Sequence, residues 1–408
     1  MAHRPPGLDA EGRAALQRRT IVVLSAGQVL GGISFGATIS LGAILAAKLS
    51  GDDALSGLAT ASITLGTALT AVPLAGLARR RGRRPALATG MLIALAGVGL
   101  VLAAITASAF ALLLVGFVLI GAGQASNLQS RFAATDLATD ASRARDLSLV
   151  IWATTIGAVL GPNLAGPGEA LGAALGMPQY TGPYLFTIAA QLLGIALVWT
   201  ALRPDPLITA HQAIAARAAG SEEITHIDRP RAAGFATVAI IGAHAVMVSI
   251  MAMTPIHLVH HGADLTVVGL TISLHIAGMY ALSPVFGVLA DRWGRVRTIL
   301  LGYAILAGCV AVIALDPHSA TAVTVALVLL GLGWSAATVA GAALLTESSA
   351  ESLRTRRQGR NDFWMSIAGA LGALGAGGAL GWAGFDGLAL LALPILAVVV
   401  LLSPLARR

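Results

Sequence analysis

Long apolar stretches separated by short polar segments recur along this whole sequence, and they leave few folds open to it. Of the 408 residues, 56% are hydrophobic and only 11% are charged. A helix of about 20 apolar residues crosses the ~30 Å hydrocarbon core of a bilayer. The sequence therefore predicts an all-α membrane protein. We expect twelve transmembrane helices, at residues 20–48, 54–78, 86–107, 109–133, 147–168, 183–202, 233–259, 265–289, 298–315, 320–345, 363–383 and 385–404.

Arginine is concentrated on one side of these expected helices. The arginines before the first helix and the run at 79–84 after the second share that side, whereas Lys48 alone lies opposite. Because cytoplasmic loops collect Lys and Arg, we expect both termini on the cytoplasmic side of a bacterial cytoplasmic membrane. The same arginines are expected to contact lipid headgroups. They are spread over several short loops rather than one stripe, so no nucleic-acid partner is expected despite a pI near 10.6.

Other features narrow the class of protein further. The first apolar stretch is too long for the core of a signal peptide and lacks a small-residue cleavage pattern, so we expect it to remain as an anchor. Cys309 is the only cysteine, which excludes an intramolecular disulfide and any Cys-x-x-Cys redox or metal site. No nucleophile and base pattern or cofactor-binding loop is recognisable, so we expect neither enzymatic activity nor a bound cofactor.

Two patterns recur along the chain with nearly the same offset. Residues 118–123 read Val-Leu-Ile-Gly-Ala-Gly, and residues 328–333, 210 positions later, read Val-Leu-Leu-Gly-Leu-Gly. The basic loop at 75–84 is echoed by the loop at 287–295, 212 positions later. Internal repeats of this kind are typical of membrane transporters built from two similar halves.

These repeats predict the domain organisation. We expect a cytoplasmic tail at 1–19, a six-helix half at 20–202 and a second six-helix half at 233–408 that ends in a short cytoplasmic tail. The segment 203–232 between them is the longest interior loop and is polar and proline-containing. It is the expected cytoplasmic linker, holding a short surface helix or partly disordered.

The second basic loop resembles a motif of the major facilitator superfamily, at the expected place between helices eight and nine. The motif residues are Gly287, Asp291, Arg292, Gly294 and Arg295. The resemblance implies that the glycine permits close helix approach, while the aspartate and arginines latch the two halves together on the cytoplasmic side during alternating access. The first copy has Arg79 at the aspartate position and Ala75 at the glycine position, so its latch is in doubt. A plainer interpretation is that Asp291 only caps a helix and the arginines only set topology.

Methionine and histidine recur on one face of each of two neighbouring helices. Four of the eight methionines lie between residues 247 and 279. Met247 and Met251 are one helical turn apart, as are His275 and Met279. At ~1.5 Å per residue the two pairs lie at similar depth, near the middle of the membrane. Alternating-access transporters bind their cargo there, so we expect the four side chains to face one another.

Thioether and imidazole ligands favour Cu(I), whereas Mg, Ca or Mn would require carboxylates. The four residues therefore predict a copper site whose ion is the transported substrate. His244, one turn before Met247, is either a further ligand or a hydrogen-bonded core residue. His257, His260 and His261, at the outer end of the same helix, either capture the incoming ion or are solvated loop residues. The alternative for the whole set is ordinary packing, since methionine is a common apolar filler.

The arrangement resembles the CcoA-type copper importers of bacterial inner membranes. Those proteins carry Met-x-x-x-Met in helix seven and His-x-x-x-Met in helix eight, and the separation of the motifs also agrees, with 24 residues from Met251 to His275. The resemblance implies copper import across the cytoplasmic membrane for assembly of a cbb3-type haem-copper oxidase. It also implies a cytoplasmic acceptor for the ion.

Two other functions remain open. Gly157-x-x-x-Gly161-Pro162 resembles the glycine and proline motif of antiporters in the same superfamily and favours a proton-coupled exporter of a hydrophobic small molecule, although such spacing is common in membrane bundles. Against it, no acidic residue is expected well inside a helix, since Asp136 and Asp146 fall near helix ends. A membrane assembly factor or sensor that transports nothing is a more distant alternative.

Overall fold

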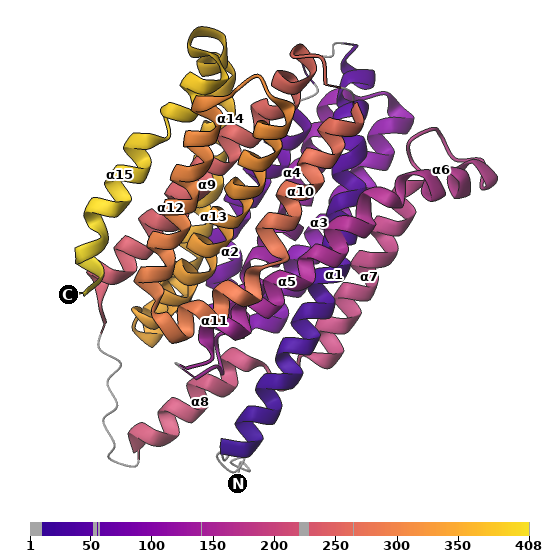
Figure 1. The fold of residues 1–408 in the computed structure, drawn as a ribbon. Helices are drawn as coiled ribbons and strands as arrows, with labels where there is room; N and C mark the ends of the chain where they lie inside the picture. Colours follow the sequence, from indigo (N-terminus) through magenta and orange to yellow (C-terminus); the bar gives the residue numbers. More distant parts are fainter. Residues whose placement is uncertain are drawn as a thin grey trace.

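The computed structural model describes residues 10–51, 55, 58–139, 141–219, 228–263 and 265–407, and this part of the chain contains helices and turns but no strand. The helices form one elongated bundle (Figure 1). They are α1 (Ala10–Ser50), α2 (Leu58–Arg81), α3 (Arg83–Ala107), α4 (Phe110–Ala133), α5 (Arg143–Asn163), α6 (Ala165–Ala174), α7 (Pro183–Ala201), α8 (Pro206–Ala219), α9 (Pro230–His260), α10 (Leu265–Tyr280), α11 (Ser283–Trp293), α12 (Arg295–Leu315), α13 (Ala320–Glu347), α14 (Glu351–Leu390) and α15 (Leu393–Leu402), followed by a 3₁₀ turn at Ser403–Arg407.

The predicted all-α membrane fold is confirmed. Within the described residues, ten stretches of helix are long and apolar enough to cross a membrane. One of them, Glu351–Ala406, contains both the eleventh and the twelfth predicted helices. Helix α14 continues past the predicted end of the eleventh and turns at Gly384, where φ is +76°. The eighth predicted helix is divided into α10 and α11 just before Pro284. The fifth corresponds to α5, which begins with two arginines and an aspartate and is not among the ten.

The repeated glycine pattern has a structural cause that is the same in both halves. A Cβ on Gly121 of α4 would lie 2.3 Å from the Ile63 carbonyl oxygen of α2, beside Gly66. In the second half, a Cβ on Gly331 of α13 would lie 2.4 Å from the His275 carbonyl oxygen of α10, beside Gly278. Small residues let membrane helices approach closely where burial of apolar surface does not drive association. Each repeat therefore marks a close crossing of two helices in its own half.

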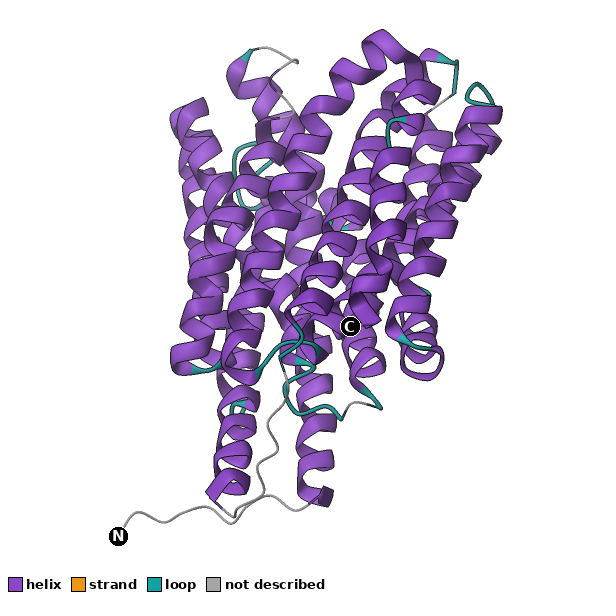
Figure 2. Ribbon diagram, turned by 90° about the vertical axis from the view of Figure 1, so that its left-hand side faces the viewer, coloured by secondary structure: helices purple, strands orange, loops and turns teal. Residues whose placement is uncertain are grey.

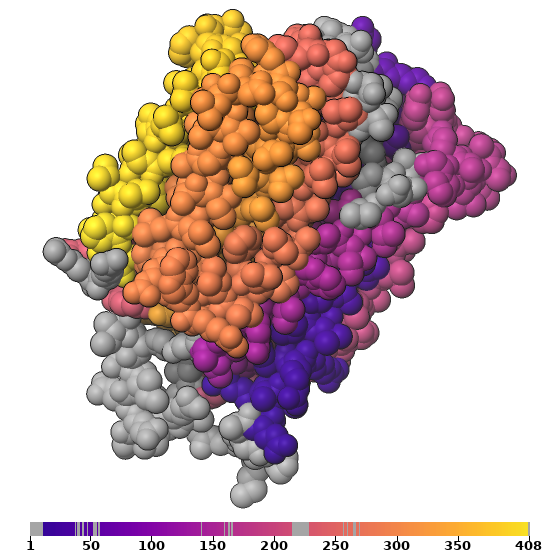
Figure 3. Space-filling model, in the orientation of Figure 1, coloured from indigo at the N-terminus to yellow at the C-terminus, as the bar shows by residue number. Residues whose placement is uncertain are grey.

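The two halves lie side by side, the first coloured indigo to magenta and the second orange to yellow (Figure 3). Helix α8 lies in the predicted linker and, with the start of α1, projects beyond the rest of the bundle (Figures 1 and 2). Residues 1–9 of the predicted tail and 220–227 of the linker lie outside the described residues.

One end of the bundle carries the α2–α3 turn, the α11–α12 turn and the start of α14. We call it the arginine-rich end, after Arg79, Arg80, Arg81, Arg83, Arg84, Arg292, Arg295, Arg297, Arg354, Arg356, Arg357 and Arg360.

Candidate functional site

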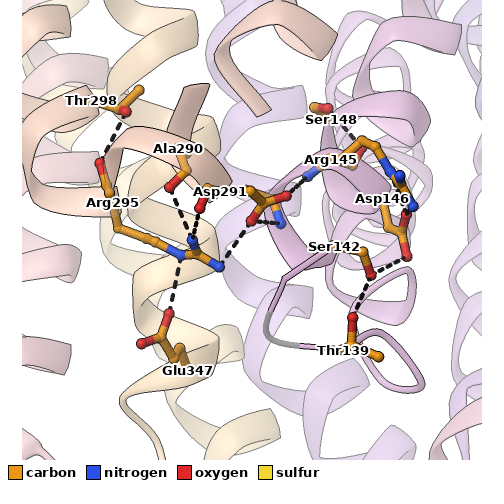
Figure 4. A network of polar contacts seen from close by, with 12 residues as sticks. Thr139, Ser142, Arg145, Asp146, Ser148, Ala290, Asp291, Arg295, Thr298 and Glu347 are labelled. Atoms are coloured by element: carbon orange, nitrogen blue, oxygen red, sulfur yellow. Dashed lines mark hydrogen bonds and ion pairs between the residues drawn. The ribbon is translucent and has the colours of Figure 1, made fainter. Parts of the chain in front are cut away.

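Asp291 of α11 reaches across to the first half at the arginine-rich end (Figure 4). Its two carboxylate oxygens accept the backbone N–H groups of Ala144 and Arg145, at 3.1 and 2.9 Å. Helix α5 begins at Arg143, so the carboxylate caps the positive end of that helix. One turn earlier, a Cβ on Gly287 would lie 2.2 Å from Ser148 Oγ, so α11 and α5 approach closely there.

Arg295 holds this carboxylate in place. Its guanidinium lies 2.9 Å from Asp291 Oδ1 and 3.1 Å from Glu347 Oε2, and it donates to the Ala290 carbonyl oxygen at 2.9 Å. Of the other predicted latch residues, Gly294 has φ of +107°, which favours glycine at the turn between α11 and α12, and Arg292 is exposed. The contact between the halves is therefore made or supported by three of the motif residues, Gly287, Asp291 and Arg295.

The first half makes a different contact at the position equivalent to Arg295. Arg83, 212 positions before Arg295, is buried and ion-paired to Asp136 at 2.8 Å. It also donates to Gln358 Oε1 of α14 at 2.8 Å, which joins the two halves. Arg79, at the position equivalent to Asp291, is exposed. The two motif copies therefore make different contacts between the halves. In the second copy Asp291 caps helix α5, and in the first copy Arg83 donates a hydrogen bond to the Gln358 side chain.

A second buried ion pair also joins the halves. Arg131 of α4 lies 2.5 Å from Asp362 Oδ1 of α14, and the two side chains are 3% and 0% exposed. Asn361 Nδ2 donates to the same carboxylate oxygen at 3.3 Å, whereas Asp362 Oδ2 has no hydrogen-bond partner among the described residues. Met365 lies next to the pair, with its sulfur 4.0 Å from Arg131 Nη2.

This pair corrects one expectation from the sequence. No acidic residue was expected well inside a helix. Asp362 fell outside the eleventh predicted helix, which was expected to begin at residue 363. Helix α14 instead begins at Glu351 and places Asp362 in its fourth turn, fully buried. The available signal was the spacing of Arg354, Gln358 and Asp362, each four residues apart and each buried, which is one face of a helix.

Aromatic rings from α9, α10 and α13 lie next to one another. Trp334 Nε1 of α13 donates to His244 Nδ1 of α9 at 3.2 Å, and the Tyr280 ring of α10 meets the Trp334 ring edge-on, with 5.9 Å between centroids. Met365, whose sulfur lies 4.0 Å from Arg131 Nη2, belongs to the same hydrophobic cluster as Trp334 and Tyr280. Trp334 and Tyr280 were not predicted as site residues, because single aromatics on apolar helices give no periodic signal.

The predicted copper ligands lie in the core of the second half. His275 is fully buried and its Nδ1 lies 2.8 Å from the Leu327 carbonyl oxygen of α13, while its Nε2 has no partner among the described residues. Met247 and Met279 are buried in the same core, and Met251 packs against it. Helix α13 packs against both α9 and α10. Among the described residues, no three His, Cys, Asp or Glu side chains are arranged to hold a metal ion.

The accessory histidines do not behave alike. His244 bonds to Trp334, which fits the prediction of a hydrogen-bonded core residue as well as that of a ligand. His257 is buried with its ring stacked on Phe385 of α14 at 4.2 Å between centroids, and the His261 ring lies 4.3 Å from it. His260 is exposed and lies outside this stack.

Sequence comparison relates the chain to transport proteins over most of its length. The family model of the Major Facilitator Superfamily matches residues 24–264 and 235–408. The uncharacterized MFS-type transporter YdeG of Bacillus subtilis is 37% identical over 368 residues, which are 88% of this chain and 85% of that protein. The riboflavin transporter RfnT of Brucella anthropi is 32% identical over 354 residues, 86% of each chain.

Solved structures share the fold at low identity. The human organic anion transporter MFSD10 (TETRAN) has a TM-score of 0.76 at 15% identity, covering 98% of this chain and 100% of that one. The transporter FucP in the outward conformation has a TM-score of 0.68 at 13% identity, covering 95% of this chain and 98% of that one.

Proposed function

This chain belongs to the Major Facilitator Superfamily, and from that premise we propose that it moves a small organic solute across the membrane by alternating access. The solute binds where α4, α9, α10, α13 and α14 come together. The observation that carries this proposal is the buried Arg131–Asp362 ion pair between the halves. Met365, beside that pair, belongs to the same hydrophobic cluster as Trp334 and Tyr280, and Trp334 binds His244.

The chemistry of these side chains defines the class of solute. Trp334 and Tyr280 offer flat apolar surfaces, each with one polar group, and such rings favour stacking with a planar partner. Arg131 offers a planar set of donors that suits carbonyl, carboxylate or phosphate oxygens. A planar ring system bearing oxygen acceptors satisfies both requirements. The 32% identical relative RfnT is called a riboflavin transporter, and riboflavin is a compound of this class.

Asp362 supplies the ionisable group that a proton-coupled mechanism requires. Ionisable residues within membrane helices are costly and usually functional. A carboxylate that pairs with Arg131 in one state and takes up a proton in the other would couple solute movement to a proton gradient. The sequence predicted no acidic residue well inside a helix, which disfavoured proton coupling, but the fully buried Asp362 of α14 is such a residue.

The contacts between the halves support an assignment of the transport state. Three contacts join one half to the other on the side of the arginine-rich end. They are Asp291 with Arg145, Arg83 with Gln358, and Arg131 with Asp362. We place that end in the cytoplasm of a bacterial cell, from the side on which arginines gather. The bundle is then closed toward the cytoplasm, and Asp291 with Arg295 forms the latch that releases when the other state forms.

Copper import is a second candidate function, and one observation favours it. A carbonyl oxygen only accepts, so His275 donates its Nδ1–H to Leu327 and leaves the lone pair of Nε2 free. Metal-binding histidines commonly fix their tautomer by such a bond. Together with Met247, Met251 and Met279, His275 would bind Cu(I) as cargo destined for a cytoplasmic acceptor and for cbb3-type oxidase assembly.

Uptake into vesicles tests both candidates with one preparation. The purified chain is reconstituted in liposomes and presented in turn with radiolabelled riboflavin and with radiocopper kept as Cu(I). Riboflavin uptake that is lost in Trp334→Leu and retained in Trp382→Leu supports the organic solute, because Trp382 is 74% exposed on the outside of the bundle. Copper uptake without riboflavin uptake would replace the first proposal by the second. Movement of neither probe above empty liposomes would contradict both assignments of cargo.

A further inference from the structure

Four aromatic rings form a row at the end of the second half opposite the arginine-rich end. Phe385 follows the turn of α14 at Gly384, His257 and His261 lie at the end of α9, and His318 lies in the turn between α12 and α13. The ring centroids are 4.2 Å apart from Phe385 to His257, 4.3 Å from His257 to His261 and 4.8 Å from His261 to His318. Three separate segments of the chain are thus brought together by imidazole rings.

Backbone carbonyls determine which ring nitrogens carry protons. His257 Nε2 lies 2.5 Å from the Pro317 carbonyl oxygen, and His261 Nδ1 lies 2.9 Å from the His257 carbonyl oxygen. Carbonyl oxygens only accept, so both of these nitrogens carry the hydrogen. In the neutral His261 ring the other nitrogen, Nε2, therefore presents a lone pair. His318 Nδ1 lies 2.9 Å from His261 Nε2, and it donates its hydrogen to that lone pair.

We propose that His261 and His318 form a binding site for a transition-metal ion of borderline softness, Zn²⁺ or Cu²⁺. A histidine whose second nitrogen donates to a backbone carbonyl, as His261 does, is in the arrangement usual for a metal ligand. Imidazole nitrogens suit both ions. The metal replaces the hydrogen between the two rings, and that hydrogen moves to His318 Nε2, so both rings stay neutral.

The spacing of the two nitrogens fits chelation. Zinc to nitrogen bonds of about 2.0–2.1 Å that enclose an angle of about 90–110° hold their nitrogens about 2.9–3.4 Å apart. The observed separation is 2.9 Å. Both side chains are exposed, so an ion reaches them from solvent. Among the described residues, no third His, Cys, Asp or Glu side chain joins the pair to form a group that could hold a metal ion.

This site differs in place and membership from the sites already described. It lies beyond the end of α9, whereas Arg131 and His275 lie within the bundle, and it does not depend on which cargo is transported. From the sequence, His257, His260 and His261 were expected either to capture an incoming ion or to be solvated loop residues. The structure instead pairs His261 with His318, uses His257 as a support stacked on Phe385, and leaves His260 outside.

Metal titration of the full-length protein in detergent tests the site. The probe is Zn²⁺ followed by calorimetry, with His261→Ala and His318→Ala as the ligand variants and His260→Ala as the matched control. All are made in a His275→Leu background, which removes the central candidate ligand. We expect each ligand variant to weaken binding by about tenfold or more, with the control unchanged.

Electron paramagnetic resonance of bound Cu²⁺ gives a readout that a folding defect would not imitate. The parent protein should show coupling to two imidazole nitrogens and His318→Ala to one. Equal zinc affinity in the parent and in His318→Ala would overturn the proposal. Equal loss in His260→Ala would also overturn it, because the ion would then be held by a diffuse histidine surface. Neither outcome depends on transport, so failure here leaves the cargo assignment to its own test.

Discussion

The carboxylate of Asp291, in the second half, accepts the backbone N–H of Arg145, in the first half, at 2.9 Å. Because the acceptor belongs to one half and the capped helix to the other, the bond exists only while the halves are together at this end. Capping interactions contribute about 0.5–2 kcal/mol each. A few contacts of this size would hold the proposed closed state without making it permanent, as alternating access requires.

Replacing Asp291 by Asn should therefore slow transport more than it weakens cargo binding. The amide keeps one oxygen acceptor but loses the charge that faces the α5 N-terminus and Arg295. A loss of about 1–2 kcal/mol in this contact corresponds to about a 5- to 30-fold shift between the two states. Initial uptake rates and equilibrium binding of the cargo measure the two effects separately. Arg79→Ala is the matched control at the equivalent exposed position, and an equal loss of rate there would contradict the proposed asymmetry.

The Arg131–Asp362 pair should respond differently to single and double substitution. Removing one partner of a buried ion pair costs about 3–5 kcal/mol, whereas replacing both by apolar residues is often neutral. Asp362→Asn should lower the thermal unfolding temperature and abolish transport. Arg131→Met with Asp362→Leu should recover the unfolding temperature without recovering transport. If the double variant transports at the normal rate, the pair serves stability alone.

Trp334 should contribute to cargo affinity through its ring and through the bond that positions His244. Trp334→Phe removes the Nε1–H donor, and a hydrogen bond contributes about 0.5–1.5 kcal/mol, which is up to roughly tenfold in affinity. Cargo titration monitored by radioligand binding gives the ratio. Trp382→Phe, on the exposed surface, should leave affinity unchanged; the same decrease in both variants would indicate a general effect of losing tryptophan.

Acid should weaken the attachment of the linker to α14. Asp228 accepts from Arg357 and from the Ala350 N–H, and these bonds hold its pKa below the ordinary value of 3.8. A carboxyl whose pKa is lowered on folding stabilises the protein above its unfolded pKa, and this stabilisation is lost as the pH falls through the folded pKa. Unfolding temperatures of the parent and Asp228→Asn should therefore differ at neutral pH, begin to approach each other below about pH 4, and meet only below the lowered folded pKa of Asp228. A difference that persists unchanged in acid would contradict this role.

The sequence predicts the bundle well because its signals are periodic and local. Apolar length predicts the helices, and the repeated Gly-x-Gly pattern marks the close crossings of Gly121 with Gly66 and Gly331 with Gly278. Asp362 was missed because hydropathy ends a helix at its first charged residues, although α14 continues through them while buried against α4. His318 was missed because its partner lies 57 positions away, in another turn.

Replacing methionine by leucine in the second half separates a metal ligand from ordinary packing. Met and Leu are close in volume, and such a swap in a packed core usually costs less than about 1.5 kcal/mol. Met251→Leu and Met279→Leu should therefore fold and reach the membrane in either case. If copper is the cargo, each swap removes a sulfur donor with little change of shape, so radiocopper uptake should collapse while protein abundance stays near that of the parent. If the cargo is a planar organic solute bound at Arg131 and Trp334, both variants should transport it at nearly the parent rate. Normal radiocopper uptake by both leucine variants would exclude these methionines as ligands and leave packing in or against the core of the second half as their role.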